Sequence, residues 1–327
     1  MAQVSQSKPK IVVSGRIFDD QLQALKARYD VIDNQADVFW TPEQLAANMK
    51  DVVGAIVTLS DKVTKDLLAQ CPHLKVVCNV AVGYNNIDVA ACTERGIVCT
   101  NTPDVLTEST ADLGFALMMA AARRITEGEH YLRAGLWKQP LALDAMTGGD
   151  LYGATLGIIG MGRIGRAVAR RGVYGFNMKL VYHNRSRLEV SMEKELNATY
   201  ATKEDVLAQA DHVVLVMPYT PENHHLIGQR EFALMKPTAT LTNIARGGIV
   251  DENALVDALK AGKIASAALD VYEGEPKVNP RLLALGNIVM TPHIGSASVP
   301  TRRMMCQLSI DNLDAVLSGK AAKTPVN

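Results

Sequence analysis

The chain alternates between short apolar runs and segments in which apolar residues recur every three or four positions. In the first hundred residues, apolar runs cover residues 10–14, 52–58, 74–79 and 97–100. Segments with helical spacing lie between them, at residues 19–27, 64–70 and 87–95. Continuous apolar strands that are separated by helices are typical of a parallel sheet covered on both faces. The pattern therefore predicts a small doubly wound α/β domain.

The pattern breaks at Thr102-Pro103 and restarts after residue 154. A helical segment at residues 107–124 follows the break, and an irregular stretch with Trp137 then covers residues 135–152. Further strands are predicted at residues 155–159, 179–182, 213–216, 239–243, 267–269 and 288–290, with a helix at residues 164–171. The last helix, at residues 301–317, could return to the first domain. We expect two α/β domains, each with a doubly wound parallel sheet, one from residues 1–102 and 296–327 and one from residues 103–295.

The composition supports two folded domains and excludes some classes of partner. The chain has 327 residues, of which 48% are hydrophobic and 21% charged, with a formal net charge of zero. This length is too great for one ordinary hydrophobic core. A neutral chain has no broad attraction for nucleic acid or for an anionic membrane. We therefore expect neither as a partner, and any anionic ligand must be bound by local cations.

The cysteines and the N-terminus point to an intracellular protein. The five cysteines form no close pair of the kind that zinc sites use, and an odd number argues against a disulfide framework. We interpret them as small buried side chains and expect no metal site. The apolar run at residues 11–13 is too short for a signal peptide or a membrane span. The expected location is the cytoplasm.

A glycine-rich turn follows the predicted strand at residues 155–159. It reads Gly160-Met161-Gly162-Arg163-Ile164-Gly165 and leads into a helix. In the dinucleotide fingerprint, one glycine makes the turn, one lets the backbone approach the pyrophosphate, and one lets the helix pack on the strand. We therefore assign Gly160, Gly162, Arg163, Ile164 and Gly165 to a dinucleotide site and residues 103–295 to a Rossmann domain. The alternative is an ordinary strand-to-helix turn.

The residues after the next strand indicate which dinucleotide is bound. An enzyme selective for NAD usually carries Asp or Glu there, on the ribose 2′-hydroxyl. This chain has Asn184, which does not repel a 2′-phosphate, followed by Arg185, Ser186 and Arg187. Two cations and a hydroxyl suit a phosphate. We expect NADP(H) to be preferred, with NAD(H) as a possible second cofactor; the alternative is a solvated basic turn.

Three later segments place a polar residue just past the end of an apolar strand. They contain Arg246, Glu275 and His293. Ligands of open α/β sheets bind at the carboxyl ends of the strands, so these three ends can form one site. Taken singly, the three could be a surface arginine, a loop charge and a packed histidine.

Together with Val80–Asn86 and the glycine turn, these segments resemble the D-isomer-specific 2-hydroxyacid dehydrogenases over nearly the whole chain. The branch of glyoxylate/hydroxypyruvate and 2-ketogluconate reductases is the most similar. The resemblance implies a flavodoxin-like substrate domain and the catalytic residues Arg246, Glu275 and His293; formate dehydrogenases of the family carry glutamine at the Glu275 position. It also implies that Val82 and Gly83 meet the substrate carboxylate. The protein is then expected to be a homodimer in which Trp137 can approach a neighbouring site. Further cofactor contacts are implied for Met217, Pro218, Ile244, Ala245, Asp270 and Gly295.

The expected reaction is reduction of a small 2-oxo acid to the D-2-hydroxy acid. Arg246 would hold the carboxylate through two parallel hydrogen bonds. His293 would donate a proton to the keto oxygen, while Glu275 orients the ring and favours its protonated form. Glyoxylate, hydroxypyruvate and 2-ketogluconate all fit this scheme. The alternative is a dinucleotide-sensing binding protein without turnover, like the C-terminal-binding-protein corepressors, which share the fold.

Overall fold

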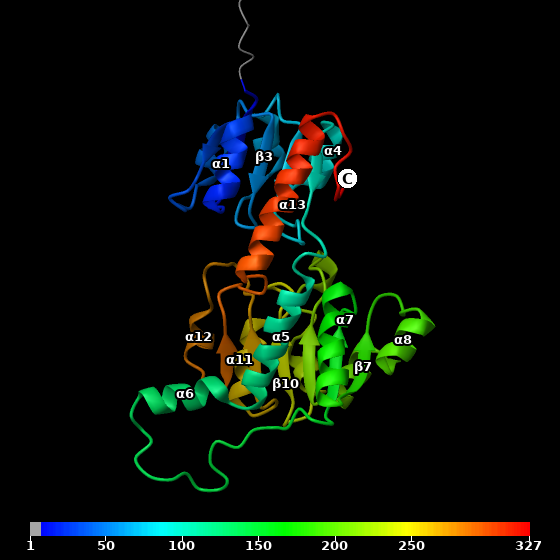
Figure 1. Cartoon of the computed structure of the whole chain (residues 1–327). Helices are drawn as coiled ribbons and strands as arrows, with labels where there is room; N and C mark the ends of the chain where they lie inside the picture. Colours follow the sequence, from blue (N-terminus) through cyan, green and yellow to red (C-terminus); the bar gives the residue numbers. More distant parts are fainter. Residues whose placement is uncertain (1–7) are drawn as a thin grey trace, which may run out of the picture. The chain divides into compact units, whose positions relative to one another are not determined.

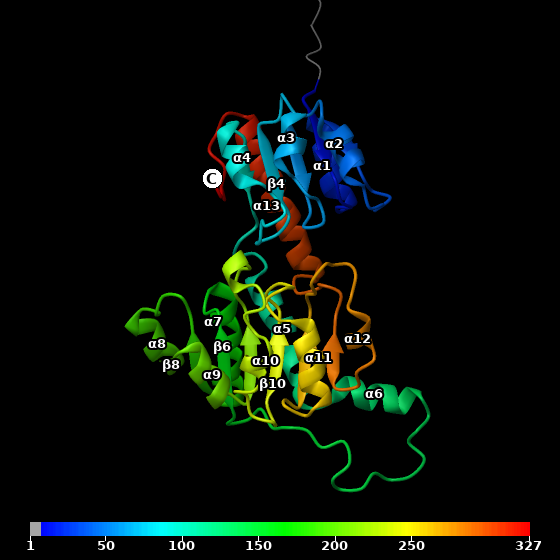
Figure 2. The same ribbon diagram turned by 180° about the vertical axis from the view of Figure 1, so that it is seen from behind.

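The computed structural model describes residues 8–327, which form two compact units (Figures 1 and 2). Of the described residues, the first unit comprises residues 8–106 and Ser298–Asn327, and the second comprises Thr107–Ala297. The boundaries expected from the sequence, after residues 102 and 295, lie slightly before these. The last helix belongs to the first unit. Among the described residues, none of the helices has the length and apolar composition that a bilayer span requires.

The first unit is built on a five-stranded parallel sheet with the order β2-β1-β3-β4-β5. This is the flavodoxin-like order, as expected from the sequence. The strands are β1 (Lys10–Val13), β2 (Asp30–Asp33), β3 (Gly54–Val57), β4 (Val76–Asn79) and β5 (Val98–Thr100). The helices are α1 (Asp19–Arg28), α2 (Pro42–Met49), α3 (Lys65–Ala69), α4 (Val89–Glu94) and α13 (Val299–Leu317).

Both faces of this sheet are covered by helices. Ile11 and Ile56 of the strands pack with Leu25 of α1 and Ile310 of α13 on one face. The opposite face packs against α2, α3 and α4, and its core includes Leu68 of α3. Residues that alternate along a strand therefore enter two different cores, which explains why the strands are apolar throughout.

The second unit has a seven-stranded parallel sheet with the order β12-β11-β10-β9-β6-β7-β8. Counted from β6, this is the Rossmann order with one added strand, so the predicted fold class is confirmed. The strands are β6 (Thr155–Ile159), β7 (Lys179–His183), β8 (Ala198–Tyr200), β9 (His212–Leu215), β10 (Thr240–Asn243), β11 (Ser266–Leu269) and β12 (Ile288–Met290).

The helices of the second unit divide between the two faces of its sheet. The helices α5 (Thr107–Ala122) and α7 (Arg163–Arg170) cover one face, and α7 continues into a π-helical turn at Arg171–Gly175. The other face carries α9 (Lys203–Gln209), α10 (Gln229–Phe232), α11 (Glu252–Lys260) and α12 (Pro280–Leu283). Two more helices are α6 (Ile125–Arg133) and α8 (Val190–Leu196), and a 3₁₀ turn covers Pro221–Asn223.

Polar side chains mark where several helices begin. Ser298 accepts a hydrogen bond from the Thr301 N–H at the start of α13, and Asp251 accepts from the N–H groups of Asn253 and Ala254 at the start of α11. Such caps satisfy N–H groups that have no partner within the helix. The segment at residues 135–152 contains no helix or strand, as its sequence indicates, and with α6 it extends away from the sheet of the second unit (Figure 2).

Candidate functional site

The glycine turn after β6 has a different steric reason for each glycine. Gly160 has a φ of +102°, and a Cβ there would overlap the backbone of Val216, which follows β9. A Cβ on Gly165 would overlap the carbonyl oxygen of Gly160, so this glycine lets α7 start close to the strand. A Cβ on Gly162 would meet no atom within 4 Å. Gly162 borders open space at the N-terminus of α7, where the fingerprint places a pyrophosphate.

The turn lies where the connections reverse direction in the second unit. The strand β6 pairs with β7 on one side and β9 on the other. This is the topological switch point, and the residues after both strands lie at the same edge because all strands are parallel. Met217 and Pro218 follow β9, and Asn223 donates a hydrogen bond to the Pro218 carbonyl at 2.8 Å. These residues fit a dinucleotide that crosses this edge.

The basic turn after β7 is more constrained than its sequence indicates. Arg187 donates two hydrogen bonds to Glu193, at 2.8 Å each, and its guanidinium lies 5.9 Å from the ring centre of Tyr200. The hydrogen bonds from Arg187 and Tyr182 lower the pKa of Glu193 to about 2. Arg187 therefore already has a carboxylate partner, which the sequence analysis did not identify because Glu193 lies on the following helix, α8.

The other residues of this turn are accessible. Asn184 donates to the backbone carbonyl of Ser186 at 3.0 Å, which closes the turn. Arg185 and Ser186 are both exposed, and within residues 8–327 Arg185 forms no ion pair. Of the two predicted phosphate-binding cations, Arg185 is thus the one whose side chain is available to a ligand.

Arg246 and Gly247 follow β10 and contact the neighbouring loop. The Asn243 side chain accepts from the Ala245 N–H at 3.0 Å and donates to the Arg246 carbonyl at 3.1 Å, which fixes the turn. A Cβ on Gly247 would overlap the backbone carbonyl of Tyr272 in the loop after β11. Burial lowers the pKa of Arg246, although the charge of Glu275 opposes this shift. The close approach at Gly247 therefore brings Arg246 next to the loop that carries Glu275.

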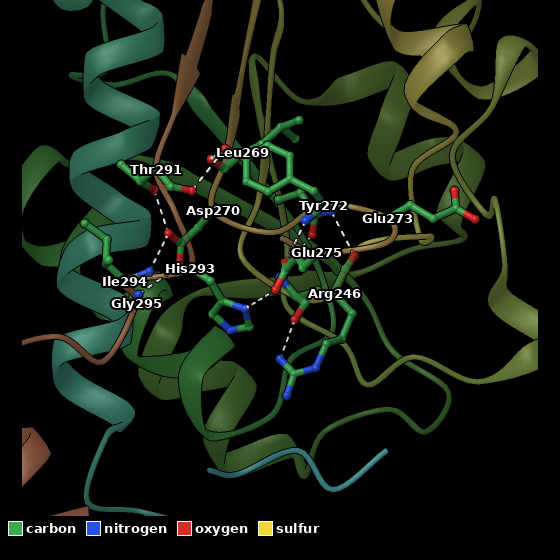
Figure 3. A network of polar contacts seen from close by, with 12 residues as sticks. Arg246, Leu269, Asp270, Tyr272, Glu273, Glu275, Thr291, His293, Ile294 and Gly295 are labelled. Carbon is green, nitrogen blue, oxygen red and sulfur yellow. Dashed lines mark hydrogen bonds and ion pairs between the residues drawn. The ribbon is translucent and has the colours of Figure 1, made fainter. Parts of the chain in front are cut away.

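Glu275 links the loop after β11 to His293 in the loop after β12 (Figure 3). One carboxylate oxygen accepts from the Tyr272 N–H at 2.8 Å, and the other lies 2.7 Å from Nδ1 of His293. Burial alone would raise the pKa of Glu275. The hydrogen bond and charge of His293, the Tyr272 N–H and the charge of Arg246 together outweigh burial, so the pKa is lowered. Since Nδ1 of His293 is used in this contact, Nε2 is the nitrogen that remains for a substrate.

Asp270 fixes the loop that carries His293. Its carboxylate is buried and accepts from the Thr291 hydroxyl at 2.6 Å and from the N–H groups of Ile294 and Gly295 at 2.8 Å each. His293 lies between these partners with a φ of +54°, in the left-handed region that a non-glycine residue rarely adopts. The sequence analysis assigned Asp270 and Gly295 to the cofactor side. Their contacts in the structure position His293 as well.

The remaining predicted residues lie in three places. Ile244 and Ala245 follow β10 and are buried at 7% and 5% exposure. Val82 and Gly83 belong to the first unit, in the loop after β4, where Asn101 donates to the Val82 carbonyl and Asn79 to the Gly83 carbonyl, both at 2.8 Å. In the described part of the chain, the N–H groups of Val82 and Gly83 have no protein acceptor. Trp137 is 59% exposed.

Comparison with known proteins gives a consistent picture. Residues 115–295 match the family described as D-isomer specific 2-hydroxyacid dehydrogenase, NAD binding domain. The chain is 46% identical over 324 residues to a glyoxylate reductase of Pyrococcus horikoshii, covering 98% of this chain and 96% of that protein. It also resembles the structure of an NADPH-dependent glyoxylate/hydroxypyruvate reductase from Sinorhizobium meliloti in complex with NADP and malonate, at 37% identity and a TM-score of 0.84, covering 98% of this chain and 97% of that one. A glyoxylate reductase from Paecilomyes thermophila is 34% identical with a TM-score of 0.86, covering 98% and 99%.

These relatives match the chain over almost its whole length, so both units are included in the similarity. The strand order of both sheets and the glycine turn are those expected of a nicotinamide-dependent dehydrogenase. The chain therefore belongs to the D-isomer specific 2-hydroxyacid dehydrogenase family, in its glyoxylate reductase branch, and is an NAD(P)-dependent oxidoreductase.

Proposed function

We propose that the protein reduces small 2-oxo acids to D-2-hydroxy acids, with NADPH as its preferred cofactor. Glyoxylate and hydroxypyruvate are the primary candidate substrates, and 2-ketogluconate is a third. The observation that carries this proposal is the contact of 2.7 Å between Nδ1 of His293 and Glu275, beside Arg246 at the carboxyl ends of three adjacent strands. The bound nicotinamide would supply the hydride, and the residues of this chain would bind the acid and move the proton.

Arg246 is the proposed carboxylate-binding residue. A guanidinium presents two parallel N–H donors that match a carboxylate, and this also fixes the neighbouring keto carbon. The N–H groups of Val82 and Gly83, which lack protein acceptors within residues 8–327, are proposed as further donors to the carboxylate. Replacement of Arg246 by lysine keeps the charge but removes the pair of parallel N–H donors, so we expect KM for the 2-oxo acid to rise.

His293 is the proposed proton donor to the keto oxygen, through Nε2. The Glu275 carboxylate accepts from Nδ1, which orients the ring and stabilises the imidazolium form. Because Asp270 holds both flanks of the loop, the ring has a fixed direction.

The test is a panel of initial rates with glyoxylate, hydroxypyruvate, 2-ketogluconate and pyruvate, for the wild type and for His293→Asn. Asparagine tolerates the left-handed backbone of residue 293. We expect kcat to fall about 100-fold or more, the scale of general acid catalysis, with unchanged binding of NADPH. Full turnover by this variant would contradict the role of His293. NADPH binding without turnover of any 2-oxo acid by the wild type would indicate a dinucleotide-sensing protein instead.

The proposed preference for NADPH rests on Arg185, Ser186 and the absence of a carboxylate at Asn184. A structural relative is named an NADPH-dependent reductase and contains NADP, which supports this proposal. We expect kcat/KM to be higher with NADPH than with NADH. Arg185→Ala should lower the value for NADPH about tenfold and leave that for NADH unchanged, because NADH has no 2′-phosphate. Equal losses with both cofactors would contradict the assignment.

We further propose that the protein is a homodimer. Large apolar side chains are exposed on α6 and the segment after it, among them Leu132, Leu136, Trp137 and Leu143. Exposed patches of this kind mark interfaces, and Trp137 is the proposed residue that approaches the neighbouring site. Replacement of Leu143 by Asp should shift the mass measured by light scattering towards the monomer. The five cysteines are free and buried, which supports the expected cytoplasmic location.

A further inference from the structure

A cluster of two histidines and a glutamate lies in the second unit and takes no part in the proposed reaction. His224 and His225 are in the loop after β9, and Glu273 is in the loop after β11. One ligand atom from each of the three side chains can be chosen so that all three lie within 4.8 Å of one another. The cluster was not evident from the sequence, because almost fifty positions separate Glu273 from the histidines.

The distances between the candidate ligand atoms approach those between the ligand atoms of a bound cation. Nε2 of His225 lies 2.9 Å from one carboxylate oxygen of Glu273, and Nε2 of His224 lies 3.8 Å from the other. Ligand atoms around a tetrahedral ion at metal–ligand distances near 2.1 Å are about 3.4 Å apart. The two distances end on different oxygens of Glu273, and the shorter one is a hydrogen bond. The Glu273 side chain must therefore turn to place one oxygen about 3.4 Å from both nitrogens.

The two imidazole rings must open to bind one ion. They are stacked with their centres 3.8 Å apart and with 23° between their planes. Because a metal ion lies in the plane of each imidazole that binds it, the rings must tilt further apart. The side chains of His224 and His225 are 41% and 38% exposed, which leaves space for this rotation.

The backbone and a neighbouring hydroxyl already hold the histidines in place. The His225 N–H donates to the Gly248 carbonyl at 2.7 Å, and His225 has a φ of +53°, in the left-handed region. The Tyr219 hydroxyl lies 3.3 Å from Nδ1 of His224. If Nε2 of His224 binds an ion, Nδ1 carries the hydrogen and donates to this hydroxyl, which would fix the ring as the outer-shell partners of metal-binding histidines do.

We propose that His224, His225 and Glu273 form a site for one divalent transition-metal ion of the zinc class, distinct from the His293–Glu275 pair. Two neutral imidazoles and a carboxylate are the ligand types that Zn²⁺ accepts, with water in the fourth position. The ion would join the loop after β9 to the loop after β11. The site is independent of the substrate and cofactor proposed above.

The experiment is a calorimetric titration of Zn²⁺ into the full-length, chelator-treated protein without an affinity tag. We expect one equivalent to bind to the wild type. Glu273→Gln and His225→Asn should lose this equivalent, and Tyr219→Phe should bind it about tenfold more weakly, the usual effect of removing a partner of a metal-binding histidine. Asparagine suits the left-handed backbone of residue 225. Zn²⁺ should also slow amide hydrogen exchange in residues 218–227 and 272–275.

Two control variants separate this site from other histidines. His130 also lies beside a glutamate, with 3.9 Å between its Nε2 and Glu129, but it has no second histidine next to it. His130→Asn should therefore keep the equivalent, and so should His293→Asn. The proposal is overturned if the wild type binds no stoichiometric Zn²⁺, if Glu273→Gln and His225→Asn retain it, or if His293→Asn loses it.

Discussion

Replacement of Asp270 by Asn tests whether a buried carboxylate holds His293, the proposed proton donor, in position. The Asp270 carboxylate accepts three hydrogen bonds, from Thr291, Ile294 and Gly295, and the side chain that these partners flank is His293. Asparagine keeps the shape but has only one oxygen. In its better orientation the amide nitrogen faces the Gly295 N–H, so two donors oppose each other and one bond is lost.

The expected loss of stability follows from these three bonds. A hydrogen bond to a charged group contributes about 1.5–3 kcal/mol, and a neutral one about 0.5–1.5 kcal/mol. One bond is lost and two are weakened, while the cost of burying a charge disappears, which leaves a net loss of about 2–4 kcal/mol. For a unit of this size, each kcal/mol lowers Tm by about 2–4 °C. A loss of 3 kcal/mol therefore corresponds to about 6–12 °C.

The kinetic effect should exceed what partial unfolding can explain. A displacement of the imidazole by about 1 Å costs roughly 100-fold in rate, so kcat should fall by this order at a temperature where the variant is fully folded. Calorimetry and initial rates with glyoxylate measure the two effects, and Asp51→Asn, at an exposed position between α2 and β3, is the control. A variant with Tm within 2 °C and kcat within twofold of the wild type would refute this reasoning.

Three further substitutions test other parts of the site. Gly247→Ala places a methyl group on the Tyr272 backbone, so we expect lower Tm and much lower kcat; near-normal values would show that the loop shifts freely. Gly162→Ala meets no protein atom, so Tm should stay unchanged while KM for NADPH rises, and an unchanged KM would contradict the pyrophosphate position. Glu275 has a folded-state pKa below its ordinary value of 4.5. The ionised carboxylate of Glu275 contributes its full stabilisation above pH 4.5. This contribution disappears as the pH falls through the lowered pKa. Glu275→Gln should thus lower the free energy of unfolding at pH 7. In urea titrations below pH 4.5, the difference between variant and wild type should shrink, and a difference that does not change with pH would contradict this.

The sequence predicted the sheet architecture because strands covered on both faces are apolar throughout. It did not predict β2, where Asp30 and Asp33 flank only two apolar residues at an edge of the sheet that is partly exposed. The strand β8, with three residues and no fully buried side chain, was missed for the same reason. Edge strands bury little surface, so they leave little pattern in the sequence.

The glycine turn and the polar residues at strand ends were also evident from the sequence, because parallel strands place their carboxyl ends together. The hydrogen-bond partners of these residues were not evident from the sequence. That Glu193 binds Arg187, or that Asp270 binds the loop of His293, depends on distances between separate loops. Sequence spacing identifies which strand end carries a side chain, but only the fold shows which backbone donors that side chain meets.

The loop after β11 contacts the loops on both sides of it, because β11 lies between β10 and β12 in the sheet. On one side its Tyr272 backbone is in close contact with Gly247, next to Arg246. On the other side its two carboxylates, Asp270 and Glu275, hold the loop and the ring of His293. Arg246, the proposed carboxylate-binding residue, and His293, the proposed proton donor, are therefore positioned by one shared loop, although neither belongs to it. A change in this central loop displaces both groups relative to a bound acid, whereas a change after β10 or β12 displaces only one.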